Sequence, residues 1–183
     1  TDFLIDFLTE QDAVYVTNGI MHAKKLTQKG CIVYLIGGEL KEATLALVGE
    51  EAMKTLGRYH FTKGFFGTNG IHIESGCTTP DIREAAIKEM AILRSAKAYI
   101  LADSTKFGQV APVTFSELDA VDIITTKLKD ATFNKYKNIV EVCARKDWIL
   151  RGCLIICVFI IGYCMFSLKM SSIIDKDLSL IHI

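Results

Sequence analysis

Six short and mostly apolar runs alternate with segments of helical character through the first 142 residues of the chain. The runs lie at 13–16, 31–36, 63–66, 97–102, 121–124 and 138–142. A strand that is apolar along its whole length is buried on both faces, and strands that alternate with helices typically form a parallel sheet. The pattern therefore predicts an α/β domain with a mostly parallel sheet and helices on both of its faces.

Composition narrows the class of protein further. The chain has 183 residues, of which 50% are hydrophobic and 23% charged, as in one globular domain. Of its 21 basic and 21 acidic residues, five basic and three acidic ones follow Val142, so the first 142 residues carry a net charge of −2. This part has no basic stripe and is not expected to hold DNA by itself.

The six cysteines form no Cys-x-x-Cys or Cys/His cluster, so we predict neither a metal site nor a cofactor bound through one. Reduced thiols in a cytoplasmic protein are favoured over disulfides.

The segment 76–108 combines a polar loop, a helix, a buried strand and a second polar loop. The pair 79–80, threonine and proline, is placed to cap the helix and to begin it. Asp81 and Glu84 lie three residues apart and share a helix face, which Lys88 continues one turn later. A surface ion pair between Glu84 and Lys88 is the alternative. In α/β sheets, loops at the carboxyl ends of strands are where ligands bind.

Other predicted strands are also followed by glycine or small polar residues, and the carboxyl ends of parallel strands meet at one edge. Amides and carboxylates suit hydroxyl groups, glycines let backbone N–H groups approach a ligand, and Lys106 suits a phosphate or carboxylate. Turn geometry alone also explains the Asn-Gly pairs and Gly-Gly. The predicted ligand site comprises Asn18, Gly37, Gly38, Glu39, Gly67, Asn69, Asp81, Glu84 and Lys106. We expect a small polar, anionic ligand and no catalytic residue.

Several motifs occur together here and at characteristic spacing: 17–19, 37–40, 46–49, 67–70, the whole of 76–108, and 121–125. They resemble the effector domain of the DeoR family of bacterial transcriptional repressors, over residues 1–142. Among its members, the fructose-operon repressors of Gram-positive bacteria, which respond to fructose 1-phosphate, are the most similar in character.

The resemblance implies a sugar-phosphate-sensing domain related in fold to ribose 5-phosphate isomerase and the CoA transferases. It also implies homo-oligomers and an N-terminal winged-helix domain that binds operator DNA. A sugar-phosphate isomerase-like enzyme is the alternative, because the related isomerases use a carboxylate base and a lysine around the substrate. Since the motifs resemble the repressors rather than the isomerases, we expect binding without chemistry.

The sequence departs from the family pattern at both ends. The winged helix is missing, so operator DNA would be contacted only through a domain absent from this chain. The first strand of the effector domain, with its phosphate-binding loop, is missing as well. The sheet is therefore expected to be truncated at its N-terminal strand.

Residues 143–183 have no counterpart in the resemblance. Within them, 152–168 is 17 residues without a charge, just short of a membrane span. A membrane anchor, a core helix, and a chimeric or out-of-frame translation are the alternatives. Because 177–183 resembles a translated sequencing adapter, we interpret the tail as non-native and disordered or standing apart from the domain, with no membrane partner.

Overall fold

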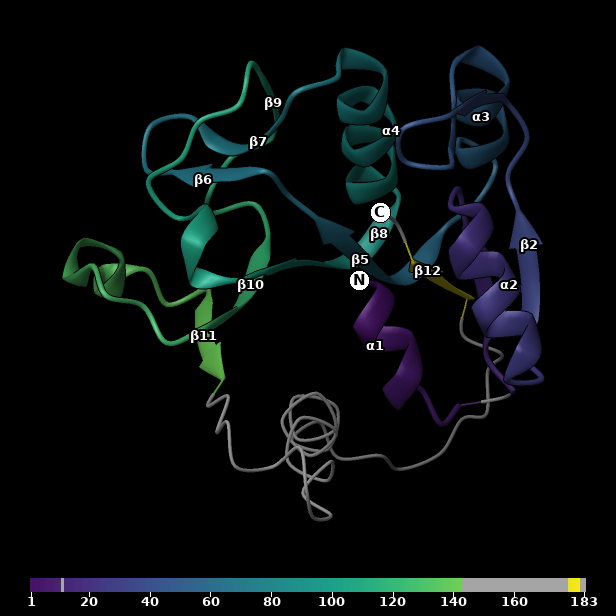
Figure 1. Ribbon diagram of the computed structural model, residues 1–183, viewed down its shortest axis with the longest axis horizontal. Coiled ribbons are helices and arrows are strands. Elements are labelled where there is room, and N and C mark those ends of the chain that lie inside the picture. Colours follow the sequence, from purple (N-terminus) through teal and green to yellow (C-terminus); the bar gives the residue numbers. More distant parts are fainter. Residues whose placement is uncertain (11, 143–177, 182–183) are drawn as a thin grey trace.

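The computed structural model describes residues 1–10, 12–142 and 178–181 (Figure 1). Its largest element is a seven-stranded sheet in the order β11-β10-β8-β5-β12-β1-β2, in which every neighbouring pair is parallel. The predicted parallel sheet is thereby confirmed. Its strands are β1 (Val14–Thr17), β2 (Ile32–Leu35), β5 (Phe61–Gly67), β8 (Ser95–Ala102), β10 (Asp122–Thr126), β11 (Ile139–Val142) and β12 (Leu178–Ile181).

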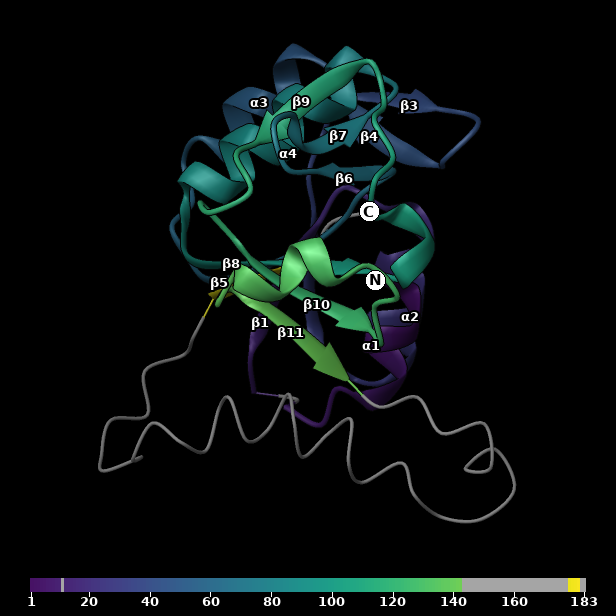
Figure 2. The same cartoon turned by 90° about the vertical axis from the view of Figure 1, so that its left-hand side faces the viewer.

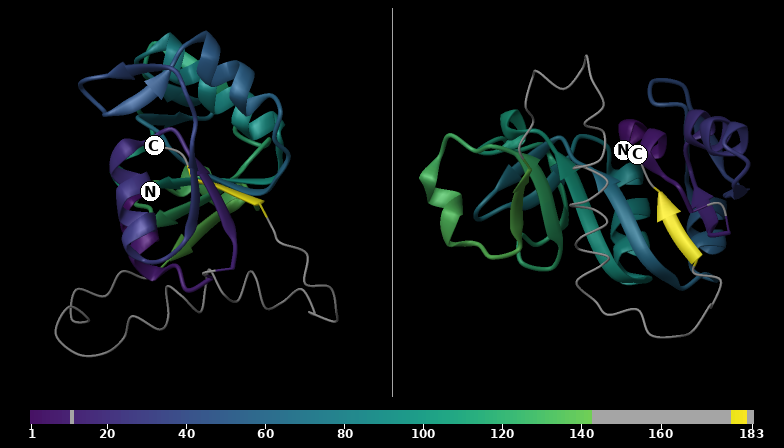
Figure 3. Two further views of the ribbon diagram at one scale, coloured as in Figure 1. Left: turned by 90° about the vertical axis from the view of Figure 1, so that its right-hand side faces the viewer. Right: turned by 90° about the horizontal axis from the view of Figure 1, so that it is seen from below.

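Helices cover both faces of this sheet, as the apolar runs predict (Figure 3, left). On one face lie α1 (Asp2–Phe7) and α2 (Ile20–Gln28), and on the other lie α3 (Glu50–Leu56) and α4 (Ile82–Leu93).

Neighbouring side chains of β1 pack on opposite faces of the sheet. Tyr15 packs with Ile5 and Leu26 beneath α1 and α2, whereas Val16 belongs to the larger core that contains α3 and α4. Successive side chains of a strand point to opposite faces, so both positions must be apolar. Burial of each such side chain contributes about 1.5–3 kcal/mol to folding.

Two small antiparallel sheets lie outside the large one (Figure 2). One is the hairpin of β3 (Glu39–Lys41) and β4 (Ala46–Val48), within a segment that shows no strand signal in the sequence. The other consists of β6 (Gly70–His72), β7 (Gly76–Thr79) and β9 (Val113–Ser116). The short helices η1 (Ser104–Lys106) and η2 (Ala131–Lys135) complete the elements up to Val142. The prediction of a loop at 76–79 is therefore wrong.

The start of α4 also differs from the prediction. Its N-cap is Asp81, whose Oδ1 accepts hydrogen bonds from the backbone N–H groups of Arg83 at 2.8 Å and Glu84 at 3.2 Å. Thr79 cannot take that position, because it pairs with Val113 in the small sheet. Pro80 favours this outcome, since a proline disfavours the helical conformation of the residue before it.

Strand β12, near the end of the chain, belongs to the sheet of the domain, whereas the sequence predicts a tail that stands apart from it. Strand β12 lies between β1 and β5 and pairs in parallel with both, so these four residues do not stand apart (Figure 3, right). Strands β1 and β5 offer backbone hydrogen bonds on the edges that face β12.

The apolar segment 152–168, with the rest of 143–177, lies outside the described residues. Within the described part of the chain, no helix is long and apolar enough to cross a membrane.

Gly76, at the start of β7, is a position where glycine is required. Its φ is +66°, and a Cβ atom there would overlap the carbonyl oxygen of Ser116. Gly76→Ala is expected to lower the free energy of unfolding by about 2–3 kcal/mol. Gly30 is a matched control, because its φ is +80° but an added Cβ would have no neighbour within 4 Å. Gly30→Ala should cost about 1 kcal/mol, measured by urea denaturation; equal losses would contradict the steric explanation.

Candidate functional site

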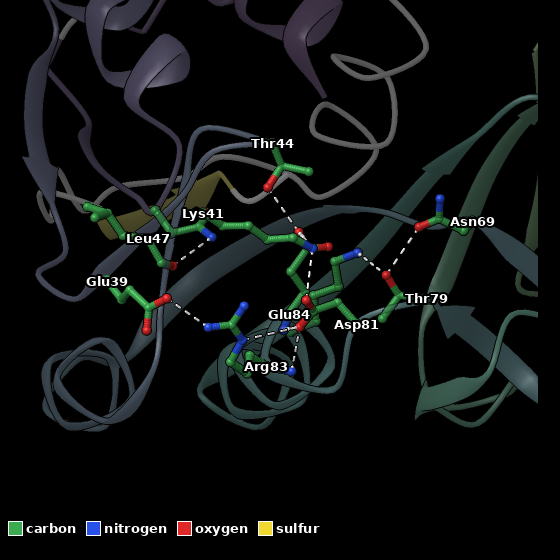
Figure 4. Close-up of polar contacts among 11 residues, drawn as sticks. Glu39, Lys41, Thr44, Leu47, Asn69, Thr79, Asp81, Arg83 and Glu84 are labelled. Carbon is green, nitrogen blue, oxygen red and sulfur yellow. Dashed lines mark hydrogen bonds and ion pairs between the residues drawn. The ribbon is translucent and has the colours of Figure 1, made fainter.

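The β3–β4 hairpin meets the first turn of α4 through a cluster of buried and half-buried charges (Figure 4). Lys41 Nζ lies 2.9 Å from Asp81 Oδ2 and 2.9 Å from Glu84 Oε1. Thr44, in the turn of the hairpin, donates its hydroxyl to the same Glu84 oxygen at 3.0 Å. One ammonium group is thus shared by two carboxylates that the sequence predicts as ligand groups.

Burial makes these contacts stronger than ordinary surface ion pairs. The side chain of Glu84 is 9% exposed, and those of Lys41 and Asp81 are 19% and 20% exposed. The hydrogen bond from Lys41 holds the pKa of Asp81 below its usual range, and the hydrogen bond to Glu84 raises the pKa of Lys41. The charged forms of Lys41 and Asp81 therefore stabilise each other, because an opposite charge at hydrogen-bond distance favours the ionised state of both groups.

A second contact ties the hairpin to α4 at the surface. Arg83 donates to Glu39 Oε1 at 2.9 Å and lies 3.8 Å from Asp81 Oδ1. The Glu39 side chain is 68% exposed, so this pair adds little stability. Glu39 consequently belongs to the rim of the cluster.

On its other side, α4 contributes a buried lysine. Lys88 is 3% exposed and donates to the hydroxyl of Thr79 at 3.4 Å, and that hydroxyl donates to Asn69 Oδ1 at 3.1 Å. Lys88 Nζ also lies 5.0 Å from the ring centroid of Phe115. Burial lowers the pKa of Lys88 to about 8. Among the residues that the structure describes, no ion pair joins Lys88 to a carboxylate.

Asn18 lies under the hairpin. Its side-chain N–H group donates to the carbonyl oxygen of Leu47 in β4 at 3.3 Å, and the backbone N–H of Leu47 donates to the Asn18 carbonyl oxygen at 2.8 Å. Asn18 is fully buried, and its Oδ1 has no hydrogen-bond donor within the described part of the chain. A buried acceptor without a partner is unfavourable, and a bound hydroxyl would satisfy it.

The two glycines before the hairpin have different roles. Gly38 has a φ of +130°, and a Cβ there would lie 2.5 Å from the carbonyl oxygen of Val48, so it permits the close approach of β4. Gly37 is exposed, and an added Cβ would have no neighbour within 4 Å. Both glycines directly precede β3, and no hydrogen bond or ion pair in the described residues joins either of them to the charged cluster.

Two predicted residues are not joined to the cluster. Gly67 is the last residue of β5 and pairs with Leu101. Lys106 lies in η1, beyond the end of β8, and no hydrogen bond or ion pair links it to the other predicted site residues in the described ranges. The structure thus brings Asp81, Glu84 and Glu39 together through Lys41 and Arg83, with Asn69 linked through Thr79 to Lys88.

Sequence reasoning missed Lys41 and Thr44 and gave Lys88 little weight. Lys41 precedes Glu84 by 43 residues, and nothing in that separation indicates contact. The signal that was available is a lysine directly after the Gly-Gly-Glu-Leu motif, in a segment bounded by glycines at 38 and 49.

Other buried reactive groups lie apart from the cluster's contacts. Burial raises the pKa of the Cys77 thiol to about 12 and lowers the pKa of His22 to about 4, so neither is a reactive thiolate or a cation at neutral pH. No group of three potential metal ligands occurs among the residues that were described.

A parallel α/β sheet with carboxylates, lysines and an unsatisfied amide oxygen beyond its strand ends has the features of a small-molecule-binding domain. The chain belongs to the DeoR family, because residues 1–127 match the model of the DeoR C terminal sensor domain. The resemblance noted in the sequence is confirmed.

Relatives of known name agree with this assignment. The chain is 42% identical over 142 residues to the "Uncharacterized HTH-type transcriptional regulator FruR" of Bacillus subtilis, covering 76% of this chain and 57% of that protein. It is 39% identical over 111 residues to the "HTH-type transcriptional regulator GlpR" of Haloferax volcanii, covering 61% and 44%. It is 35% identical over 111 residues to a "Lactose phosphotransferase system repressor" of Staphylococcus epidermidis, covering 60% and 44%. The chain spans about half of the length of these curated relatives.

Proposed function

We propose that the chain is the effector-sensing domain of a DNA-binding repressor of sugar utilisation genes. Its ligand is a sugar phosphate such as fructose 1-phosphate. Membership of the DeoR sensor family and the names of its relatives support the regulatory part of this proposal.

The observation that carries the ligand class is the pair of carboxylates on the first turn of α4. Asp81 and Glu84 sit beside Lys41, and the unpartnered Asn18 oxygen lies beneath the same hairpin. Carboxylate and amide oxygens accept hydrogen bonds from sugar hydroxyls, and a charged acceptor makes the stronger bond. Lysine supplies the positive charge that a phosphate requires.

In this proposal the domain binds and does not turn over its ligand, because conversion would remove the signal. A sensor acts by binding its ligand with different affinity in two states. Operator DNA is contacted by a part of the repressor outside this chain, since residues 1–142 carry a net charge of −2. The repressor acts in the cytoplasm as a homo-oligomer.

Isothermal titration of the 183-residue chain with fructose 1-phosphate, fructose 6-phosphate, free fructose and inorganic phosphate tests the ligand class. At least one sugar phosphate should bind. Asp81→Asn and Glu84→Gln should each weaken that binding by about 10- to 100-fold, as expected for loss of a hydrogen bond to a charged group. Glu89→Gln, an exposed position on α4, is the matched control and should bind normally.

NMR of the bound sugar separates the sensor from an isomerase. The sugar should remain unchanged over hours in the presence of the protein. Conversion to an isomer faster than in buffer would replace the sensor proposal with an enzyme. Failure of every probe to bind, or unchanged affinity in both carboxylate variants, would overturn the ligand proposal.

A further inference from the structure

Lys41 occupies the atoms that a sugar would need. Asp81 Oδ1 already caps α4, and Asp81 Oδ2 and Glu84 Oε1 both receive the Lys41 ammonium group at 2.9 Å. Thr44 donates a second hydrogen bond to the same Glu84 oxygen. Donors from the hairpin therefore already occupy these two carboxylate oxygens, and a ligand hydroxyl that takes the place of the Lys41 ammonium group at either oxygen must displace it.

The hairpin is firmly held on one strand only. Ala46 and Val48 of β4 are fully buried, whereas Leu40, Leu45 and the turn residues 42–43 are exposed. In the described residues, the side-chain bonds from segment 39–45 to α4 are those of Glu39, Lys41 and Thr44 (Figure 4). Thr44 bonds to Glu84, and Lys41 bonds to both Glu84 and Asp81. Loss of their contacts leaves the exposed Glu39–Arg83 pair.

We propose that Lys41 changes partner when the effector binds: sugar hydroxyls take its place at Asp81 and Glu84, and its ammonium group passes to the phosphate. This inference rests on the proposed function and adds to it both the residue that selects a phosphorylated sugar and the movement that reports binding. Segment 39–45 is released from α4 by the exchange.

The exchange explains why a ligand would need both chemical groups. A free sugar can satisfy the two carboxylates but leaves the Lys41 ammonium group without a partner. Inorganic phosphate can pair with Lys41 but leaves the buried Glu84 carboxylate unpaired. A sugar phosphate satisfies all three charges in one molecule. Lys106 has no bond to this cluster among the described residues, so it takes no part in the exchange at Asp81 and Glu84.

Lys41→Met tests the exchange by titration. Lys54→Met is the matched control, because Lys54 also pairs with two carboxylates but is exposed on α3. In the wild-type chain we expect the sugar phosphate to bind about 10- to 100-fold more tightly than the free sugar. In Lys41→Met this preference should fall to about threefold or less, while the free sugar binds at least as well as to wild type, because its competitor is gone. Lys54→Met should keep the wild-type preference.

Hydrogen exchange of segment 39–45 supplies a second readout. Exchange should accelerate when the wild-type chain binds the sugar phosphate, and it should be fast in Lys41→Met without any ligand. An unchanged phosphate preference in Lys41→Met, or slower exchange of 39–45 on binding, overturns the inference and leaves the proposed function standing. A wild-type chain that binds no sugar phosphate overturns both.

Discussion

Glu84→Ala is expected to lower the free energy of unfolding by about 3–5 kcal/mol, the range for breaking a buried ion pair by removing one partner. The substitution leaves the Lys41 ammonium group with Asp81 alone and takes the acceptor of Thr44 away. It also removes the negative charge that favours the protonated form of the buried Lys88. Urea denaturation at neutral pH measures the loss.

Two further variants separate charge from packing at this position. Glu84→Gln keeps an acceptor for Lys41 and Thr44 and should lose less than Glu84→Ala. Glu89→Ala changes the same residue type at an exposed place on α4 and should be close to neutral. If Glu84→Ala and Glu89→Ala lost equal stability, the cluster would have no structural importance.

Lys88→Met should act in the opposite direction and stabilise the domain by about 3 kcal/mol at pH 7. Burial lowers the pKa of Lys88 to about 8 from 10.5, and one pKa unit corresponds to about 1.4 kcal/mol. Below pH 8 Lys88 is charged in both states, but only the folded state holds that charge away from water, so the charge lowers the stability of the fold. Methionine fills a similar volume without that charge, and replacing a buried ion by an apolar side chain often increases stability.

The pH dependence of stability identifies the cause. Between pH 8 and pH 10.5 the unfolded state keeps the Lys88 proton and the folded state has lost it, so the stability of the wild-type chain gains from Lys88 as pH rises. The stabilisation by Lys88→Met should thus shrink across this window, measured by denaturation at each pH. Lys88→Arg remains charged and should be less stable than wild type throughout. A constant difference between wild type and Lys88→Met would contradict the assignment.

The large sheet could be read from the sequence because its signal is local. Strands such as β1 and β5 have side chains buried on both faces, so they appear as mostly apolar runs, and the asparagine and glycine residues after them mark where they end. The placement of Asp81 and Glu84 on one face of α4 follows from helical spacing in the same way.

The hairpin could not be read from the sequence because its pairing depends on distant residues. Strands β3 and β4 have three residues each, too few for a periodic pattern, and β4 is fixed by its bonds to Asn18. The cap of α4 was ambiguous for a related reason. Thr79 and Asp81 are both good capping residues. Asp81 is the cap because Thr79 pairs with Val113 in the small sheet, a pairing that the local sequence does not show.

Asp81 divides two tasks between the two oxygens of one carboxylate. Oδ1 accepts from the backbone N–H groups that begin α4, and Oδ2 faces Lys41. A change of partner at Oδ2 therefore leaves both N-cap hydrogen bonds of α4 in place. At Asp81, a contact on the ligand side can thus change while the hydrogen bonds that begin α4 stay in place, so this one side chain can respond to a ligand without loss of the helix cap.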